Sequence, residues 1–222
     1  VTVNGSGFTG ATDVLFNGVS ASGFSVISDL QLTAVVPASA TTGVITVQNG
    51  TCTGSSTTNF TTNITLSLKF FLQGYYQGTG LMSRPLYTLG YTTDSTISDS
   101  ATIRLYSPSD LTTPAHSFTG RFHTDGNMSC TFSGSAAGDT FYIAIVHKNH
   151  LMTWSKTPVL FGNTTTYDFT TAASKGYADQ LADLGDGSFA SYAGDFTNGT
   201  TDGVQDGYIN GADYNSMENL IP

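Results

Sequence analysis

The oxygen-bearing side chains that could do chemistry are concentrated at the end of the chain, in GDFTNGTTDGVQDGYINGADYNSMENLI, residues 194–221. Calcium loops of the EF-hand type take oxygen ligands at positions 1, 3, 5, 7, 9 and 12 and place glycine at position 6. With Asp206 and Gly207 at positions 5 and 6, the main-chain carbonyl of Tyr208 falls at position 7, Asn210 at 9 and Asp213 at 12. The sequence therefore predicts a calcium-binding segment.

The front half of this loop is irregular. Strict spacing puts Asp202 at position 1 and Val204, which has no side-chain oxygen, at position 3. In the alternative that we favour, the loop begins at Gly194-Asp195 and is expanded by several residues. Thr197, Asn198 or Asp202 would then supply the missing oxygens. The predicted ligand set lies in this segment: Asp195, Asn198, Asp202, Asp206, Tyr208, Asn210 and Asp213. The plainer alternative is a surface loop of ordinary turn formers that binds nothing.

Residue sets that could catalyse a reaction are less clearly indicated by the sequence than the calcium loop. The aspartates at 179, 183 and 186 lie close together, and a glycosidase needs two carboxylates beside its cleft, but they fall in a polar run typical of a solvated helix and turn. The pair His147 and His150 could bind zinc, yet no Cys, Asp or Glu cluster stands beside it in the sequence. A strand end with hydrogen-bonded histidines fits better. We expect no enzymatic activity.

Aromatic side chains offer a different chemistry. A sugar-stacking platform could be built from Tyr75, Tyr76, Tyr87, Tyr91 and Trp154, although aromatics more often fill cores and loop bases. A carbohydrate-binding appendage of a larger secreted hydrolase is therefore the alternative function, with glycans as the partners.

Composition indicates which elements must position these residues. The chain has 222 residues, only 10% of them charged, and a net charge of −9, while serine and threonine make up roughly a quarter. Threonine, aromatics and 25 glycines favour short strands joined by tight turns. We expect an all-β protein. Few Lys and Arg residues argue against nucleic-acid binding, and no apolar run is long enough for membrane insertion.

The strand pattern divides the chain into three parts. The first, residues 1–62, alternates short apolar strands with turn signals, at Val1–Val3, Asp13–Phe16, Phe24–Ile27, Leu32–Val36 and Val44–Val47. Residues 63–172 form a second antiparallel β-sandwich with period-two strands at Ile64–Leu72, Ala101–Tyr106 and Phe141–Val146, and a hairpin turn near Asp125-Gly126. Residues 173–222 are a linker and the calcium loop, followed by a short helical pattern.

The first part resembles a known domain type. VNGSGFTGATDVLFNG and VVPASATTGVITVQNG look like the IPT/TIG type of immunoglobulin-like domain, which implies an interaction or spacer module without chemistry of its own. The strand that precedes this point in the family is missing here. Either the chain is incomplete at this point or another chain supplies the strand. In the second case, strand complementation on an exposed sheet edge could build a fibre.

The remainder resembles a module near the C-termini of large secreted proteins of Bacteroidetes-type bacteria, through LSLKFFLQGYYQGTGLM, DSATIRLYSP, IVHKNHLMTWSKTPV and YDFTTAASKGYADQ. A dockerin-like "GD.N.DG.I...D" segment follows in that group, and the likeness assigns calcium to Asp195, Asp206, Asn210 and Asp213. A full dockerin has two such loops, whereas one is present here.

Together these patterns predict two consecutive antiparallel, immunoglobulin-like β-sandwiches and a C-terminal segment with structural calcium. The expected role is a structural or adhesive surface protein, extracellular or on the cell surface of a bacterium, that associates with itself or with other surface proteins. For such an exported chain we expect a disulfide between Cys52 and Cys130, with two free buried thiols as the alternative.

Overall fold

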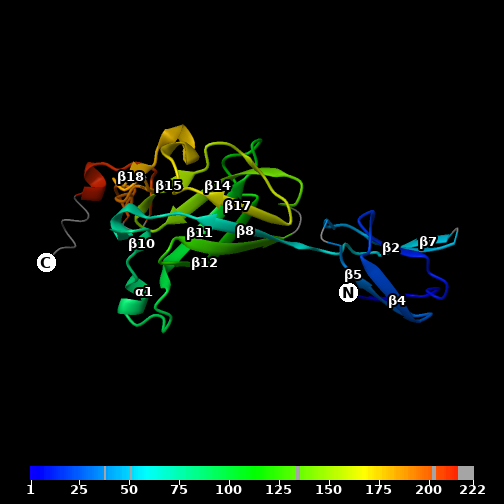
Figure 1. Cartoon of the computed structure of the whole chain (residues 1–222). Helices are drawn as coiled ribbons and strands as arrows, with labels where there is room; N and C mark the ends of the chain where they lie inside the picture. Colours follow the sequence, from blue (N-terminus) through cyan, green and yellow to red (C-terminus); the bar gives the residue numbers. More distant parts are fainter. Residues whose placement is uncertain (38, 51, 134–135, 202–203, 215–222) are drawn as a thin grey trace. The chain divides into compact units, whose positions relative to one another are not determined.

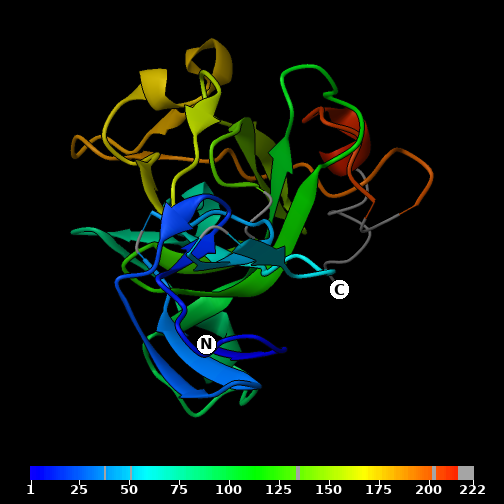
Figure 2. The same cartoon turned by 90° about the vertical axis from the view of Figure 1, so that its right-hand side faces the viewer.

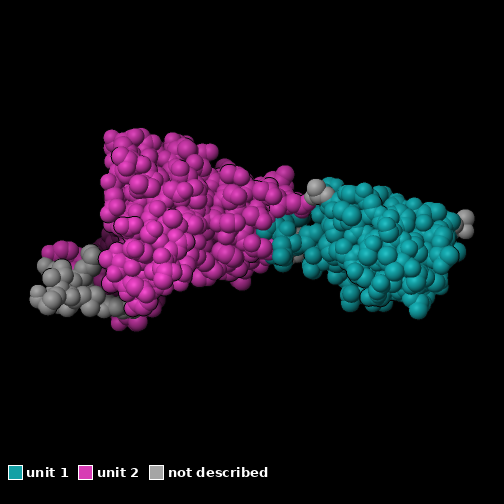
Figure 3. Space-filling view, turned by 60° about the horizontal axis from the view of Figure 1, so that its bottom comes forward, with its two compact units in different colours: residues 1–64, 133–137 teal, residues 65–132, 138–222 magenta. Residues whose placement is uncertain are grey.

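The computed structural model describes residues 1–37, 39–50, 52–133, 136–201 and 204–214. The chain is mostly β-structure in several antiparallel sheets, as the composition predicted (Figure 1). It divides into two compact units, coloured separately in Figure 3. The first unit holds Val1–Ile64 and Ser133–Ala137, and the second holds Thr65–Phe132 and Gly138–Pro222. No helix within the described ranges is long and apolar enough to cross a membrane.

Two sheets make up the first unit. One has the order β1-β5-β4 and the other the order β3-β2-β6-β7, with antiparallel pairing throughout the described strands. The strands are β1 (Thr2–Asn4), β2 (Asp13–Phe16), β3 (Val19–Ser20), β4 (Gly23–Ser28), β5 (Gln31–Val35), β6 (Ile45–Asn49) and β7 (Cys52–Ser55). Each strand range predicted in this part corresponds to one of these strands.

The core of the first unit lies between its two sheets. Alternate residues point inward, so Val14 and Phe16 from one sheet meet Leu32 and Ala34 from the other, all fully or almost fully buried. Phe60 closes the core edge-on against Phe16, with ring centroids 5.0 Å apart. The alternation that predicted the strands is thus the pattern that builds this core.

The second unit has two principal sheets. The larger has the order β12-β11-β14-β15, with β16 also paired to β14, and the smaller has the order β13-β8-β17. The long hairpin of β11 and β12 is drawn in green in Figure 2. The strands of these sheets are β8 (Asn63–Lys69), β11 (Ile97–Tyr106), β12 (His116–His123), β13 (Asn127–Ser133), β14 (Thr140–His147), β15 (His150–Trp154), β16 (Val159–Leu160) and β17 (Thr164–Asp168).

Shorter elements complete the second unit. Two small antiparallel pairs lie outside the principal sheets, and single helical turns connect the strands. These elements are η1 (Gln73–Tyr75), β9 (Tyr76–Gly78), β10 (Leu81–Met82), α1 (Pro85–Thr88), η3 (Ala173–Lys175), η4 (Tyr177–Asp179), β18 (Ala182–Asp183) and β19 (Phe189–Ala190). A final helical turn spans residues 211–214.

Period-two alternation also accounts for the core of the second unit. On β8 the predicted inward residues Leu66 and Leu68 are buried, as is Ile64, the last residue of the first unit's main segment. The inward residues of β13 follow the same rule. Rings extend this packing: Phe70 packs on Phe122, with centroids 5.0 Å apart. A turn does lie near Gly126, between β12 and β13, and Gly126 adopts a φ of 84° there. The two strands belong to different sheets, so the prediction of a hairpin at this turn was wrong.

One strand pair departs from the antiparallel prediction. β17 pairs in parallel with β8, with Thr164 opposite Thr65 and Asp168 opposite Lys69. A parallel neighbour needs a long crossover connection, and most of the second unit lies between these two strands in sequence. Local turn signals cannot show such a pairing, so the prediction of a purely antiparallel second sandwich was wrong at this pair.

The predicted disulfide is also wrong, because both cysteines are free. Cys52 is exposed on β7 of the first unit, whereas Cys130 points into the core of the second unit from β13. A thiol that is fully buried within its own unit cannot reach one that is exposed on the other.

The two thiols should therefore differ sharply in reactivity. We expect a thiol reagent to modify one cysteine, Cys52, in the native protein and both after unfolding. Burial raises the pKa of Cys130 to about 12 and keeps its reactive thiolate scarce. Titration of native and denatured protein measures this, and Cys52→Ser should remove the native signal. A native Cys52–Cys130 disulfide would instead give no reactive thiol in either state.

Candidate metal centre

The C-terminal segment packs against the turn between β14 and β15. Main-chain bonds run from Leu151 N–H to the Tyr192 carbonyl and from Gly194 N–H to the Asn149 carbonyl, and His150 forms an isolated bridge with Ala193. The segment that begins at Gly194 is drawn in orange and red in Figures 1 and 2. The predicted calcium loop is thus attached at its start to the hairpin of β14 and β15.

Asp195 lies at the centre of this loop. Its side chain is fully buried, and its two oxygens accept the N–H groups of Asp206 and Gly207 at 3.3 and 3.2 Å. Gly207 adopts a φ of 86°, a backbone conformation that glycine tolerates and other residues rarely adopt. The sharp turn expected at Asp206-Gly207 therefore wraps around the carboxylate of Asp195.

Asp213 closes the other end of the loop. Its Oδ1 accepts the N–H groups of Phe196 and Thr197 at 3.0 and 3.1 Å, and its Oδ2 accepts that of Asn210 at 2.9 Å. Asn210 in turn accepts the N–H of Ala212 at 2.8 Å, which makes a capping box at the start of the final helical turn. The half-loop from Asp206 to Asp213 predicted from spacing is closed by these contacts.

The pKa values of these two carboxylates are shifted in opposite directions. The pKa of Asp195 is raised, chiefly by burial, and the nearby carboxylates of Asp213 and Asp206 add to the effect. Burial also acts to raise the pKa of Asp213, but the N–H groups of Asn210, Phe196 and Thr197 outweigh it and leave that pKa below its ordinary value. Neither carboxylate has an ion-pair partner among the described residues. Two buried negative charges thus lie close together without a cationic side chain.

The other predicted ligands are exposed and make local contacts. Asn198 accepts the N–H groups of Thr200 and Thr201, and Asp206 accepts that of Tyr208, as expected for Asx turns. The Tyr208 ring is exposed, so only its carbonyl suits the predicted role. Asp202 lies outside the described residues. Over the described ranges, no three His, Cys, Asp or Glu side chains converge on one point as metal ligands.

The donor set nevertheless fits calcium better than the other common metals. The loop offers only oxygen donors, which suit hard cations, and no His or Cys that would favour zinc. Each oxygen of Asp195 accepts one N–H and keeps a lone pair. A cation at this position would also offset the repulsion between the neighbouring carboxylates.

No family model matches the chain, and no curated protein matches it significantly. The resemblances to an IPT/TIG domain and to a dockerin-like segment stay predictions.

Sequence reasoning missed a buried polar cluster beside this loop. Asp99, on β11, is 2% exposed, and its Oδ2 accepts the Tyr75 hydroxyl at 2.7 Å and lies 3.1 Å from the Lys148 ammonium group. His147 Nε2 lies 3.4 Å from the same oxygen. Asp99 is far from the histidines in sequence, so only the pairing of β11 with β14 brings these groups together.

The histidines form a hydrogen-bonded pair, as their strand-end position predicted. His150 Nδ1 lies 3.1 Å from the Asn149 amide oxygen and 2.9 Å from His147 Nδ1. Because an amide oxygen only accepts, His150 Nδ1 carries the hydrogen, and the Nε2 atom of His147 faces Asp99. The Nε2 atoms of both rings are buried and have no hydrogen-bond partner. Asp99 lies on the Nε2 side of His147 and His150 on its Nδ1 side, so the three do not surround one point.

The pKa values of Asp99 and His150, two members of this cluster, are both lowered. Burial acts to raise the pKa of Asp99, but the contacts of its carboxylate with His147, Tyr75, Ser100 and Lys148 outweigh it and hold that pKa well below its ordinary range. Burial lowers the pKa of His150 to about 3, and the neighbouring His147 adds to the effect. His150 is therefore neutral in the folded protein at ordinary pH.

The side chain of Gln205 joins the cluster to the loop. The Gln205 amide donates to the carbonyls of both His150 and Asp195. Gln205 was not among the predicted ligands, and its spacing gave no signal for this structural role.

The predicted sugar-stacking residues do not form one platform. The Tyr75 hydroxyl is bound to Asp99 and that of Tyr76 to Asp186, while Trp154 stacks on Tyr106 with centroids 4.4 Å apart. The exposed members are Tyr87 and Tyr91. Three of the five predicted aromatics are thus engaged within the unit.

The three clustered aspartates have separate partners. Asp179 pairs with Lys156, Asp183 accepts the N–H of Gly185, and Asp186 accepts the Tyr76 hydroxyl. None of the three is buried.

Acid should destabilise the second unit through His150. A histidine with a folded pKa below its unfolded value binds fewer protons when folded, so its contribution is present above the unfolded value of 6.5 and is lost as pH falls towards about 3. We expect the free energy of unfolding to fall by up to about 1.4 kcal/mol per pH unit in this window. Asp99 should add to the loss only below its ordinary value of 3.8. Denaturant titrations from pH 7 to 4 measure the slope.

The matched variants for this test are His150→Asn and His123→Asn. His123 is exposed at the end of β12, so its variant should keep the wild-type slope, whereas His150→Asn should flatten it. Equal slopes for wild type and His150→Asn would contradict the assignment.

Proposed function

We propose that this protein is an exported structural or adhesive surface component of a bacterium whose C-terminal loop is held by a structural calcium ion. The observation that carries the proposal is the pair of buried carboxylates, Asp195 and Asp213, which close the loop and have no cationic partner among the described side chains. Burying charge without a counter-ion is unfavourable, so a bound cation has a clear energetic role here.

Oxygen atoms of this chain would hold the calcium ion. Asp195, Asp206, Asn210 and Asp213 would supply side-chain oxygens, and Tyr208 its main-chain carbonyl. The bound calcium ion would supply positive charge that offsets the repulsion between the carboxylates, and its role would be structural. The residues of the chain close the loop through main-chain N–H groups, orient the carboxylates and exclude water from Asp195.

The surroundings of the loop support a structural role. The segment is anchored on the β14–β15 hairpin through Gly194, and Gln205 ties it to the carbonyl of His150. Calcium would therefore stabilise the attachment of the chain end to the second unit. A ligand that binds only the folded form stabilises by about 2.7 kcal/mol at a hundred times its dissociation constant.

The adhesive role is supported by the surface chemistry of the first unit. Over residues 1–64 the charged side chains are Asp13 and Asp29, and hydroxyl groups dominate the rest. We infer that both units are immunoglobulin-like sandwiches and that the first provides edges for association with other chains, including copies of itself assembled into a fibre by strand complementation. Low charge removes the repulsion that usually keeps sheet edges apart.

Calcium removal should lower the melting temperature of the second unit. We expect millimolar calcium to raise it by roughly 5–10 °C over the value in EDTA, since about 2.7 kcal/mol corresponds to that shift in a unit of this size. Asp195→Asn and Asp206→Asn should lose most of the response. Asp125→Asn is the matched control, because Asp125 is a turn carboxylate outside the loop. A melting temperature equal in EDTA and calcium would refute the calcium assignment.

The two candidate roles differ in what the native protein does in solution. Ordered fibres in negative-stain images of the full chain would support the structural role. Binding of monomers to a glycan array, lost in Tyr91→Ala, would support the carbohydrate-binding alternative, since Tyr91 is the most exposed of the predicted stacking residues.

A further inference from the structure

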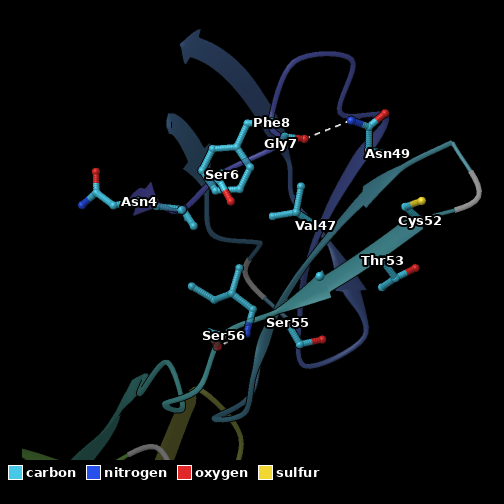
Figure 4. A pocket seen from close by; sticks show the side chains of 14 residues that line it. Asn4, Ser6, Gly7, Phe8, Val47, Asn49, Cys52, Thr53, Ser55 and Ser56 are labelled. Carbon is cyan, nitrogen blue, oxygen red and sulfur yellow. Dashed lines mark hydrogen bonds between the residues drawn. The ribbon is translucent and has the colours of Figure 1, made fainter. Parts of the chain in front are cut away.

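A groove of about 520 Å³ opens in the first unit between the edges of its two sheets (Figure 4). On one side it is lined by β1 and the turn that follows, and on the other by β7. Its floor is formed by Phe8, Ile45 and Val47, which also pack against the core of the unit. The lining residues are Val3, Asn4, Gly5, Ser6, Gly7, Phe8, Ile45, Val47, Asn49, Cys52, Thr53, Gly54, Ser55 and Ser56.

The edge strand β7 presents main-chain groups to this groove. Ser56 N–H bonds to the Ile45 carbonyl, and the register places Gly54 opposite Val47 and Cys52 opposite Asn49. Because bonding alternates along an antiparallel ladder, Cys52 and Gly54 face β6, whereas the N–H and C=O groups of Thr53 and Ser55 face away from it. β7 has β6 as its strand partner among the described strands.

The edge strand β1 is open in the same way. Val1 exchanges two bonds with Ala34, and Gly5 N–H bonds to the Leu30 carbonyl. Alternation then turns the main-chain groups of Thr2 and Asn4 away from β5. Two rows of main-chain donors and acceptors thus border one groove.

Both edge strands are short, but neither carries a residue or a bulge that blocks strand addition. Lysine, proline and bulges commonly blunt exposed edges, and both β1 and β7 lack them and pair in a continuous register. No charged residue lines the groove. Gly54 adds room beside Val47, because a Cβ at this glycine would meet nothing within 4 Å. The groove is therefore open, uncharged and apolar at its floor.

We propose that this groove binds an extended, uncharged segment of a second polypeptide, which pairs with β7 as an added strand. Its main chain would bond to Thr53 and Ser55, and alternate apolar side chains would cover Phe8, Ile45 and Val47. β7 is the better edge because all four of its residues are exposed and it is longer than β1. The inference deepens the proposed structural role and rests on it for the presence of a partner chain, but it does not depend on calcium.

The test uses the full chain and a synthetic peptide of about eight alternating threonine and valine residues, labelled with a fluorophore. The peptide should bind saturably by fluorescence anisotropy and should protect the exposed Cys52 from a thiol reagent over the same concentration range. An N-methylated peptide, which lacks main-chain donors, and a peptide with lysine at the inward positions should both fail to bind.

Matched protein variants locate the pairing edge. Thr53→Pro removes the outward N–H without breaking a β6–β7 bond and should weaken binding about tenfold, while Thr53→Ala, which keeps that N–H, should bind as wild type. Equal binding by both variants, binding of the N-methylated peptide, or no binding at millimolar peptide would each overturn the proposal. The peptide controls decide the question even where Thr53→Pro is poorly folded.

Calcium separates this test from that of the proposed function. Peptide binding should be equal in EDTA and in calcium, because the groove lies in the first unit and the loop in the second. If calcium does not raise the melting temperature but the peptide still binds, the metal assignment alone is refuted. If the peptide does not bind but calcium raises the melting temperature, the proposed peptide-binding groove alone is refuted.

Discussion

Aspartate carboxylates that accept main-chain N–H groups hold the loops of this protein in place. Asp29 binds the N–H groups of Gly7 and Thr9 and fixes the turn that carries Phe8 into the first core. Asp195 and Asp213 do the same for the C-terminal loop. In a chain with seven lysines and arginines, carboxylates find main-chain donors far more often than cationic partners. Such charge-assisted bonds are stronger than neutral ones, so few are needed to order long turns.

Much of the fold could be predicted because its cores follow local alternation. Ile64, Leu66 and Leu68 lie on one face of their strand in sequence and in the structure alike. The parallel partner of this strand could not be predicted, because no local signal connects Thr65 with Thr164. The free thiols are explained in the same way. The inward direction of Cys130 could be predicted from its strand, but the assignment of the two cysteines to separate units depends on the tertiary fold.

The candidate site was predictable in its spacing and not in its surroundings. The closing roles of Asp206-Gly207, Asn210 and Asp213 follow from a local pattern of turns and a helix start. The burial of Asp195 depends on the hairpin beneath it, and the link through Gln205 depends on the carbonyl of His150. Asp99 reaches the histidines only through sheet pairing, so the polar cluster has no signature in the sequence.

The parallel pairing of β8 with β17 has a consequence for how the chain acquires its structure. β8 is the first strand of the smaller sheet in sequence, and its partners β13 and β17 are both made later. When two distant segments pair, the chain loses entropy through loop closure before the stabilising contacts form. Such pairings therefore form slowly. The second unit therefore cannot complete its sheet until residues 164–168 have been synthesised. Through most of the synthesis of the second unit, β8 therefore lacks one of its two neighbours in the smaller sheet.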